Sequence, residues 1–300
     1  MKKLITIFTI ALPLLVNAQT DPLYNQYLFN QGMINPAYSG INNSFNLTVI
    51  SRAQWAGVSG APVTNTLNAG SSLFRDKVGV GLTVLNDQLG VNSNSEVNVS
   101  VNYRLVFTHS KLSFGMQGGV VNYRYDYSKL NTEVVDQRIT QAISNFSQPN
   151  LGMGIFYMRD KFYVGFSVPR MLNVTVQDGV SSSTRYRRHL YFSTGYVFER
   201  MKGIKLKPSI LIRQVEGVPP TIDLNIQALF VQTLWAGFTT RNLNTIGLIA
   251  QLQIARKLRA GYLYEYPLNS LANTNFGTHE LMIGLDLGLL DSQFTSRRYF

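Results

Sequence analysis

The stretch "HELMIGLDLGLL", residues 279–290, decides the fold class because apolar residues alternate along it with polar or small ones. A period of two is typical of a β-strand whose two faces meet different surroundings. The alternating sets are Leu281, Ile283, Leu285, Leu287 and Leu289 on one face and Glu280, Met282, Gly284, Asp286 and Gly288 on the other. The stretch therefore predicts a strand with one continuous apolar face.

The same period recurs along the chain, for example in "TIDLNIQALF" (221–230) and "EVNVSVNYRLVF" (96–107). Runs of this kind, separated by turn-forming residues, predict further strands. We predict fourteen strands near residues 44–54, 63–74, 77–86, 94–107, 111–127, 148–159, 161–169, 188–199, 203–214, 220–231, 233–240, 245–255, 257–266 and 278–290.

The links between the predicted strands differ in length on the two sides. Links after even-numbered strands are short, such as "RD" at 75–76 and "QT" at 232–233, whereas those at 128–147 and 170–187 are long. Short turns on one side and long loops on the other are typical of an up-and-down outer-membrane β-barrel. An even number of strands would leave both chain ends on the short-turn, periplasmic side.

A transmembrane barrel is favoured over the alternative, a soluble β-sandwich. The apolar runs are about ten residues long, which matches a tilted strand that spans a bilayer. A closed barrel also satisfies every backbone group inside lipid. Aromatic residues that suit interfacial girdles lie near strand ends: Tyr123, Tyr125, Tyr127, Tyr191, Phe192, Tyr196, Phe198, Tyr262, Tyr264 and Tyr266.

Composition excludes several classes of function. Only 14% of the 300 residues are charged, against roughly 25% in a typical soluble domain. The net charge is +11, but the basic residues form no stripe, so we expect no nucleic-acid partner. The chain has no cysteine, which excludes disulfides, thiolate metal sites and a lipid-modified cysteine.

Residues 1–18 are expected to be a signal peptide. Lys2 and Lys3 precede an apolar run at 4–16, and small residues follow. The run is too short to span a bilayer as a helix, although an N-terminal membrane anchor is the alternative. We divide the chain into the signal peptide (1–18), an N-terminal periplasmic or plug segment (19–43) and a transmembrane β-barrel (44–300). The last ten residues, 291–300, are either a periplasmic extension or part of a displaced last strand.

The stretch "DPLYNQYLFNQGMINPAYSG", residues 21–40, follows neither the strand period nor the helix period. Asn35-Pro36 is expected to break any helix and to turn the chain into the first strand. Either the aromatic side chains plug the lumen from below, or they present an apolar face to a periplasmic partner. The residues assigned to this plug or partner segment are Tyr24, Tyr27, Phe29, Asn35, Pro36, Tyr38 and Gly40.

No catalytic residue, cofactor or metal site is predicted. The three histidines, His109, His189 and His279, lie in a turn or at strand starts, and serine is too common for a Ser–His spacing to indicate a hydrolase. No His or carboxylate spacing matches a metal site.

Polar residues on the inner strand faces are expected to form either a charge network or a surface that holds a peptide, plug or solute. The residues assigned to the lumen or its rim are Asp223, Arg241, Arg259, Glu265, His279, Glu280 and Asp286. Lys205, Lys207 and Arg213 are also expected to point inward.

The stretch "RAQWAGVSGAPVT" (52–64) is expected at the top of the first strand and in the first outer loop. Glycines there permit turns, and proline fixes φ where the chain re-enters a strand. Asp87 is expected to cap a turn in the following outer loop. This outer-loop motif is either a rigid loop in the barrel mouth or a partner contact, and it comprises Arg52, Gln54, Trp55, Gly57, Gly60, Pro62 and Asp87.

Both "QYLFNQGMINPAYSG" (26–40) and "RAQWAGVSGAPVT" resemble the PorP/SprF family of type IX secretion outer-membrane proteins. Less specific similar stretches follow in order: "GVGLTVLNDQLG" (79–90), "KLSFGMQGG" (111–119), "FYVGFSVPRML" (162–172), "LKPSILIR" (206–213) and "THELMIGLDL" (278–287). The resemblance covers nearly the whole chain after residue 18, and His279 and Glu280 are among the matching positions.

The resemblance implies an integral outer-membrane β-barrel of Bacteroidota without enzymatic activity. It implies support for the export and surface retention of partner proteins, including gliding adhesins, that carry a type B C-terminal signal domain. It also implies links to periplasmic motor, ring or peptidoglycan-linked components, besides outer-membrane lipid. The alternatives are a porin or a transporter of small solutes or hydrophobic ligands and, less favoured, an outer-membrane hydrolase.

Overall fold

The computed structural model describes residues 25–28, 30–126, 143–172, 174–178, 181–186, 188–201 and 203–288. Its strands β1 to β7 comprise Ser44–Ala53, Val63–Leu73, Val78–Leu89, Asn92–Val106, Ser110–Asp126, Ile143–Arg159 and Phe162–Arg170. Strands β10 and β12 to β17 comprise His189–Tyr196, Ile204–Val215, Thr221–Phe230, Leu234–Arg241, Thr245–Ala255, Leu258–Pro267 and Thr278–Gly288.

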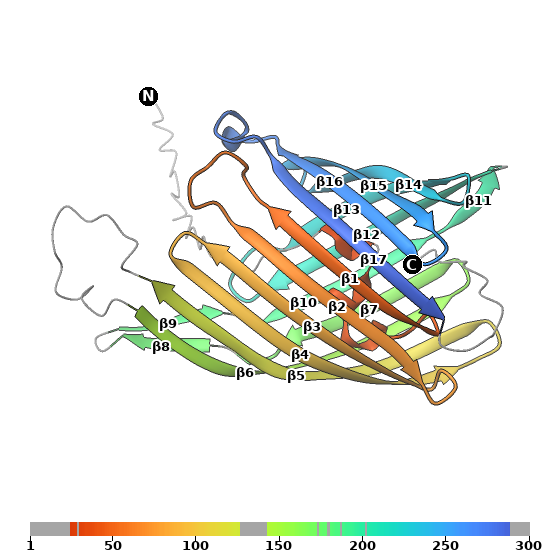
Figure 1. Ribbon diagram of the computed structural model, residues 1–300, viewed down its shortest axis with the longest axis horizontal. Helices are drawn as coiled ribbons and strands as arrows, with labels where there is room; N and C mark the ends of the chain where they lie inside the picture. Colours follow the sequence, from red (N-terminus) through yellow and green to blue (C-terminus); the bar gives the residue numbers. More distant parts are fainter. Residues whose placement is uncertain are drawn as a thin grey trace, which may run out of the picture.

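These strands form one closed antiparallel barrel (Figure 1). Each strand pairs with its neighbours along the chain, β1 pairs with β17, and β10 pairs with β12 to complete the ring. The short β11 (Phe198–Met201) also pairs with β12, so fourteen of the fifteen strands in this sheet close the ring. The predicted fourteen-stranded transmembrane barrel is therefore confirmed.

The two faces of each strand have the expected difference in polarity. On β17, Leu281 and Ile283 are each 61% exposed, whereas Glu280 and Asp286 on the other face are at most 3% exposed. The exposed face is apolar because it contacts hydrocarbon, and the buried polar face lines the lumen. Backbone groups are paired around the ring, which leaves no sheet edge in lipid.

The structure differs from the predicted strand map on the long-loop side. Strand β6 begins at Ile143 rather than near 148, because β5 continues to Asp126 and offers it a partner edge. A separate hairpin lies in the predicted loop 170–187, formed by β8 (Val174–Asp178) and β9 (Ser181–Tyr186). A short 3₁₀ helix, η5 (Ser270–Asn273), lies in the loop before β17. Within the described residues, no helix has the length and hydropathy needed to cross a membrane.

Candidate functional site

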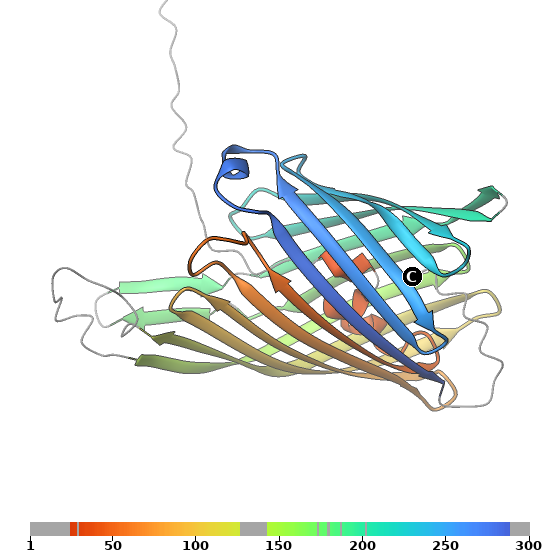
Figure 2. The same ribbon diagram turned by 45° about the horizontal axis from the view of Figure 1, so that its top comes forward.

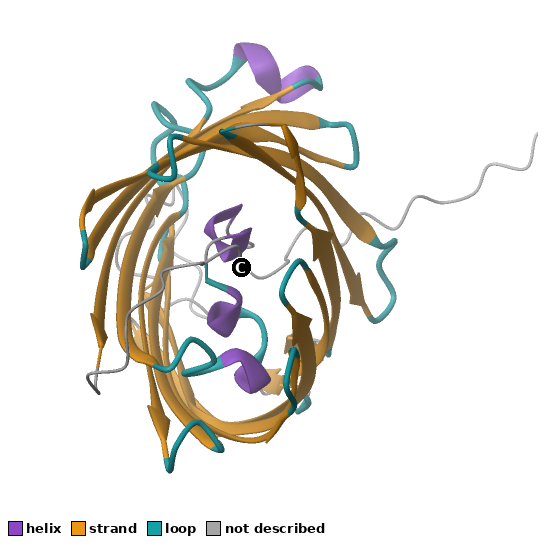
Figure 3. Cartoon of the chain, turned by 90° about the vertical axis from the view of Figure 1, so that its right-hand side faces the viewer, coloured by secondary structure: helices purple, strands orange, loops and turns teal. Residues whose placement is uncertain are grey.

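The described N-terminal residues, 25–28 and 30–43, lie inside the barrel; we call them the lumen segment (Figure 2). They contain the 3₁₀ helices η1 (Asn25–Leu28), η2 (Gln31–Met33) and η3 (Pro36–Tyr38), which lie within the ring of strands (Figure 3). Both Tyr27 and Ala37 are at most 1% exposed. The lumen segment is therefore packed against the barrel wall.

Local sequence explains the turns of the lumen segment. Asn35 is extended, as a residue before proline tends to be, and its side chain accepts a hydrogen bond from the Ala37 N–H at 3.0 Å. Pro36 begins η3, where its fixed φ suits a first helical position. Asn35 therefore separates η2 from η3, and the pair caps and begins a further short helix before the chain reaches β1.

The β4 wall binds the end of the lumen segment. The Ser39 and Ser100 hydroxyls lie 2.8 Å apart, and the Asn102 amide donates to the Ser39 carbonyl at 2.8 Å. Arg104 donates to the Gly40 carbonyl at 2.7 Å. Gly40 has a φ of 67°, a conformation that favours glycine. Wall side chains thus satisfy backbone carbonyls that no strand or helix satisfies.

The β6–β7 wall binds the middle of the segment. Asn35 donates to the Ile155 carbonyl at 3.1 Å, and the Ser167 hydroxyl donates to the Ile34 carbonyl at 2.6 Å. The Gln31 side chain donates to the Tyr163 hydroxyl at 3.3 Å. Each contact joins residues more than a hundred positions apart, so the segment's place depends on the closed barrel.

Tyr27 meets a charged pair on β13 and β14. Its hydroxyl accepts a hydrogen bond from Asn225 at 3.1 Å and lies 3.4 Å from the Asp223 carboxylate, to which it donates. Arg241 pairs with the same carboxylate at 2.8 Å. Burial, followed by the charge of Asp223, raises the pKa of Tyr27 well above its usual value. The phenol therefore stays neutral and keeps its proton for Asp223.

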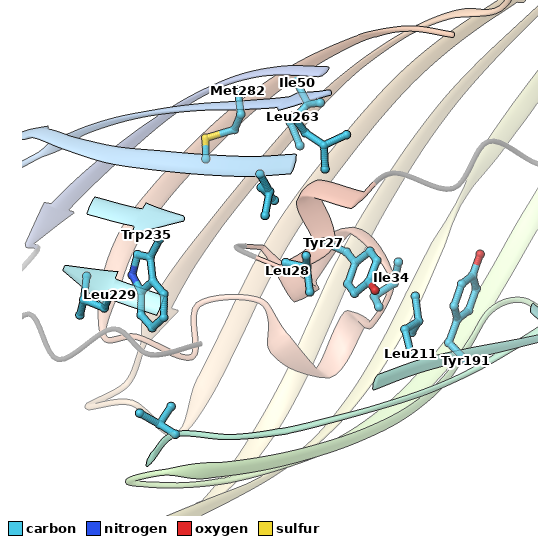
Figure 4. Close-up of a cluster of buried hydrophobic side chains, with 12 residues drawn as sticks. Tyr27, Leu28, Ile34, Ile50, Tyr191, Leu211, Leu229, Trp235, Leu263 and Met282 are labelled. Atoms are coloured by element: carbon cyan, nitrogen blue, oxygen red, sulfur yellow. The ribbon is translucent and has the colours of Figure 1, made fainter. Parts of the chain in front are cut away.

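Apolar residues of the segment join a lumenal cluster (Figure 4). The cluster comprises Tyr27, Leu28, Ile34, Ile50, Tyr191, Val197, Leu211, Leu229, Trp235, Ile249, Leu263 and Met282. Beside it, Lys207 donates to the Leu28 carbonyl at 3.3 Å and lies 4.7 Å above the Trp235 ring centroid. A cation over an indole face is favourable, and more so when desolvated.

Glycines in the wall make room for the segment. At Gly115 on β5, a Cβ atom would overlap the backbone of Ala37, and at Gly154 on β6 it would overlap the Asn35 side chain. Gly79 on β3 has the same relation to the Ser39 carbonyl. These wall glycines allow the close approach of two backbones.

A charged cluster fixes the segment where it enters β1. Asp76, in the turn before β3, pairs with Arg104 and with Lys111 at 2.5 Å. Lys111 also donates to the Ile41 carbonyl at 2.9 Å. The cluster therefore links a short turn, two wall strands and the lumen segment.

Most of the residues predicted to line the lumen are buried: Lys207, Arg213, Asp223, Arg259, Glu265, Glu280 and Asp286. Arg241 and Lys205 are partly exposed. Arg52, which we assigned to the outer-loop motif, points inward from β1 and pairs with Glu280 at 2.6 Å. Glu265 lies 3.9 Å from the same guanidinium. Arg52 thus belongs to the lumenal charge network.

The rest of the loop between β1 and β2 is held by backbone hydrogen bonds. Trp55, Gly57 and Gly60 have φ angles of 51°, 91° and 73°. The Gln54 N–H donates to the Pro62 carbonyl at 2.9 Å, which closes the loop. Further backbone hydrogen bonds join it to the neighbouring loops after β3 and β16. Three loops therefore form one connected surface at the barrel mouth.

Two of the predicted site residues, Asp87 and His279, have surroundings that differ from those we predicted. Asp87 lies within β3 and accepts a hydrogen bond from Thr64 at 2.6 Å, so the prediction that it caps a turn was wrong. His279 lies on the outward face of β17, where its Nδ1 is 2.7 Å from the Tyr262 hydroxyl. Its alternation with the buried Glu280 could have placed it there from the sequence.

Several predictions fall outside the described residues. They concern Tyr24 and Phe29, the signal peptide at 1–18, and residues 291–300.

Sequence reasoning missed the residues that hold the lumen segment. Ser100, Asn102 and Arg104 alternate with apolar residues on β4, which marked them as inward but not as contacts of Ser39. Among the described residues, no group of three or more His, Cys, Asp or Glu side chains could hold a metal ion. The contacts that hold the lumen segment are hydrogen bonds, ion pairs and apolar contacts.

A closed antiparallel barrel with an apolar outer face, whose lumen holds part of its own chain, defines an integral outer-membrane β-barrel protein. The type IX secretion system membrane protein PorP/SprF family matches residues 16–285. The chain therefore belongs to the PorP/SprF family and is an outer-membrane barrel of type IX secretion.

No curated protein matches the chain. Solved structures with a similar fold include the Acinetobacter baumannii outer membrane protein Omp33, with a TM-score of 0.46, 9% identity, and coverage of 82% of this chain and 99% of that one. A TodX deltaS2S3 mutant, a monoaromatic hydrocarbon channel, has a TM-score of 0.44 and 9% identity, covering 88% and 93%. The KdgM porin has a TM-score of 0.39 and 9% identity, covering 81% and 98%. These similarities carry no functional conclusion.

Proposed function

We propose that this barrel binds a secreted surface protein, such as an adhesin, through that protein's type B C-terminal signal domain. Binding anchors the surface protein or supports its export, and the barrel itself catalyses no reaction. The family match over residues 16–285 carries this proposal.

The packing of the lumen supports a binding role over a diffusion role. The lumen segment contacts β4, β6 and β7 on one side and β12 and β13 on another. A porin needs a water-filled passage, and this segment occupies part of that space. We therefore place the cargo on the connected outer loops, with the lumen segment as a plug. A porin or a transporter of hydrophobic ligands is the alternative.

We also propose that the long loops face outward and that the N-terminus and short turns face the periplasm. The short turns then meet the periplasmic motor, ring or peptidoglycan-linked components. The short connections support this orientation, since outer-membrane barrels have short periplasmic turns.

A deletion strain tests the proposed function. Mass spectrometry of surface and medium fractions should show one or more surface proteins with a type B domain released or missing, and restored by the wild-type gene. The purified barrel should also co-isolate with that protein from native membranes. Unchanged surface proteins in the deletion strain would refute the proposal.

Planar-bilayer recording distinguishes the proposed binding role from the alternative, a porin. The purified wild-type barrel should show no steady open conductance. A stable open channel, together with normal surface proteins in the deletion strain, would establish the porin instead.

A further inference from the structure

The turn between β2 and β3 has an uncommon backbone. Two consecutive residues with positive φ are normal for a type I′ hairpin turn, and the β13–β14 turn has two, Val231 and Gln232. The β2–β3 turn has three, Phe74, Arg75 and Asp76, with φ angles of 50°, 53° and 71°. Aspartate tolerates this left-handed conformation, but phenylalanine and arginine adopt it only at a cost in free energy. Contacts around the turn must therefore hold it in this shape.

The contacts that hold the turn are those of Asp76. Phe74 at the tip is 75% exposed, whereas Asp76 is only 8% exposed. The Asp76 carboxylate pairs with Arg104 and Lys111. It also accepts a hydrogen bond from the Ser72 hydroxyl at 3.1 Å. These contacts offset the unfavourable backbone of the two residues before Asp76, so the shape of the turn and the ion pairs depend on each other.

The two cations that hold Asp76 also hold the end of the lumen segment. Arg104 donates to the Gly40 carbonyl at 2.7 Å, and Lys111 donates to the Ile41 carbonyl at 2.9 Å. Arg104 is only 1% exposed, and a buried cation without an anion is strongly unfavourable. If Asp76 moves away, both cations therefore lose the carboxylate that positions them for the two carbonyls.

We propose that the β2–β3 turn is a latch for the lumen segment. In the held state, Asp76 is buried and fixes residues 39–43 through Arg104 and Lys111. In the released state, the turn adopts an ordinary backbone, Asp76 moves out to solvent, and residues 39–43 detach from β4 and β5. The other contacts of the lumen segment remain. The latch goes beyond the proposed function, and it does not depend on which way the barrel faces.

The conformational change that this latch requires is small. Strands β2 and β3 are paired up to Leu73 and Val78, so only residues 74–77 need to change conformation. The side chains of Phe74, Arg75 and Lys77 at the tip are exposed. A ligand that binds this tip can therefore shift the balance between the held and released states, by as much as its affinities for the two states differ.

Hydrogen exchange measured by mass spectrometry tests the latch, with the full-length protein in lipid nanodiscs. Arg75→Val places a β-branched residue at a positive φ, so it should release the segment and speed exchange at residues 39–43 about tenfold. Arg75→Gly suits the left-handed backbone and should slow this exchange several-fold. Asp76→Asn keeps a residue that tolerates the turn but removes the ion pairs, so it should also speed exchange at residues 39–43.

Two control variants match these changes. Arg75→Lys keeps the charge and adds no β-branch, so its exchange should equal that of the wild type. Gln232→Val makes the valine change at a positive φ in the exposed β13–β14 turn, on strands other than those that Asp76 joins. It should leave exchange at residues 39–43 unchanged. A heat-dependent gel shift verifies that every variant is folded.

The other end of the lumen segment provides an internal reference. Residues 25–28 are held by β12 and β13, so their exchange should stay at the wild-type rate in the Arg75 and Asp76 variants. If either folded variant, Arg75→Val or Asp76→Asn, exchanges at residues 39–43 as the wild type does, the latch is overturned. Equally faster exchange at residues 25–28 would also overturn it, because the whole segment would then have loosened. These outcomes do not depend on surface-protein export, so they are distinguishable from failure of the proposed function.

Discussion

At the scale of single residues, several lumenal charges are held in ion pairs. Arg259 and Asp286 are 8% and 3% exposed, and their charged atoms lie 2.8 Å apart. A buried charge without a partner costs far more than a buried pair. Pairing therefore explains how polar strand faces can be packed inside the barrel rather than left open to water.

We predict that Arg259→Met destabilises the barrel by about 3 kcal/mol because it leaves the Asp286 carboxylate buried without its cation. Urea unfolding in lipid vesicles measures this loss. The control is Arg259→Met/Asp286→Leu, which removes both charges and should recover most of the stability. A single variant as stable as wild type would show that the pair contributes little.

At the scale of elements, wall glycines and the lumen segment fit each other. Gly115 and Gly118 lie on the same strand, but their environments differ. A Cβ atom at Gly115 would overlap Ala37, whereas at Gly118 its nearest contact would be Leu151 at 3.8 Å. The strand therefore carries its own matched control for the role of the segment.

We predict that Gly115→Val displaces the lumen segment and gives the barrel an open conductance in planar bilayers, because valine needs the space of Ala37. Gly118→Val should remain closed like wild type. A heat-dependent gel shift verifies that both barrels are folded. If folded Gly115→Val stays closed, the segment is not what occludes the lumen.

At the scale of the whole molecule, the barrel has two opposite rims, one with the long loops and one with the short turns. Exposed Val58 lies in the loop between β1 and β2, and exposed Thr108 lies in the short turn between β4 and β5, on the opposite rim. The absence of cysteine allows each rim to be labelled by one introduced thiol.

For the proposed orientation, Val58→Cys should react with a membrane-impermeant maleimide on intact cells, and Thr108→Cys should react after the outer membrane is opened. Fluorescence of the labelled band measures both. The wild-type protein, without cysteine, is the blank. The reverse labelling pattern would show that the barrel has the opposite orientation in the membrane.

The sequence by itself determined the number of strands in the barrel ring, their inner and outer faces and the short turns that join them on one side. These features follow from a period of two and from turn residues, which are local properties of the chain. Even the outward position of His279 was available from its alternation with Glu280. The limits of β3 and β6 were not, because pairing with a neighbouring strand extends each of them.

Only the tertiary structure decided where the N-terminal segment lies and what holds it. Ser39 meets Ser100, and Tyr27 meets Asn225, across 61 and 198 positions of sequence. Such contacts have no local pattern, since they exist only after closure brings distant strands around one lumen.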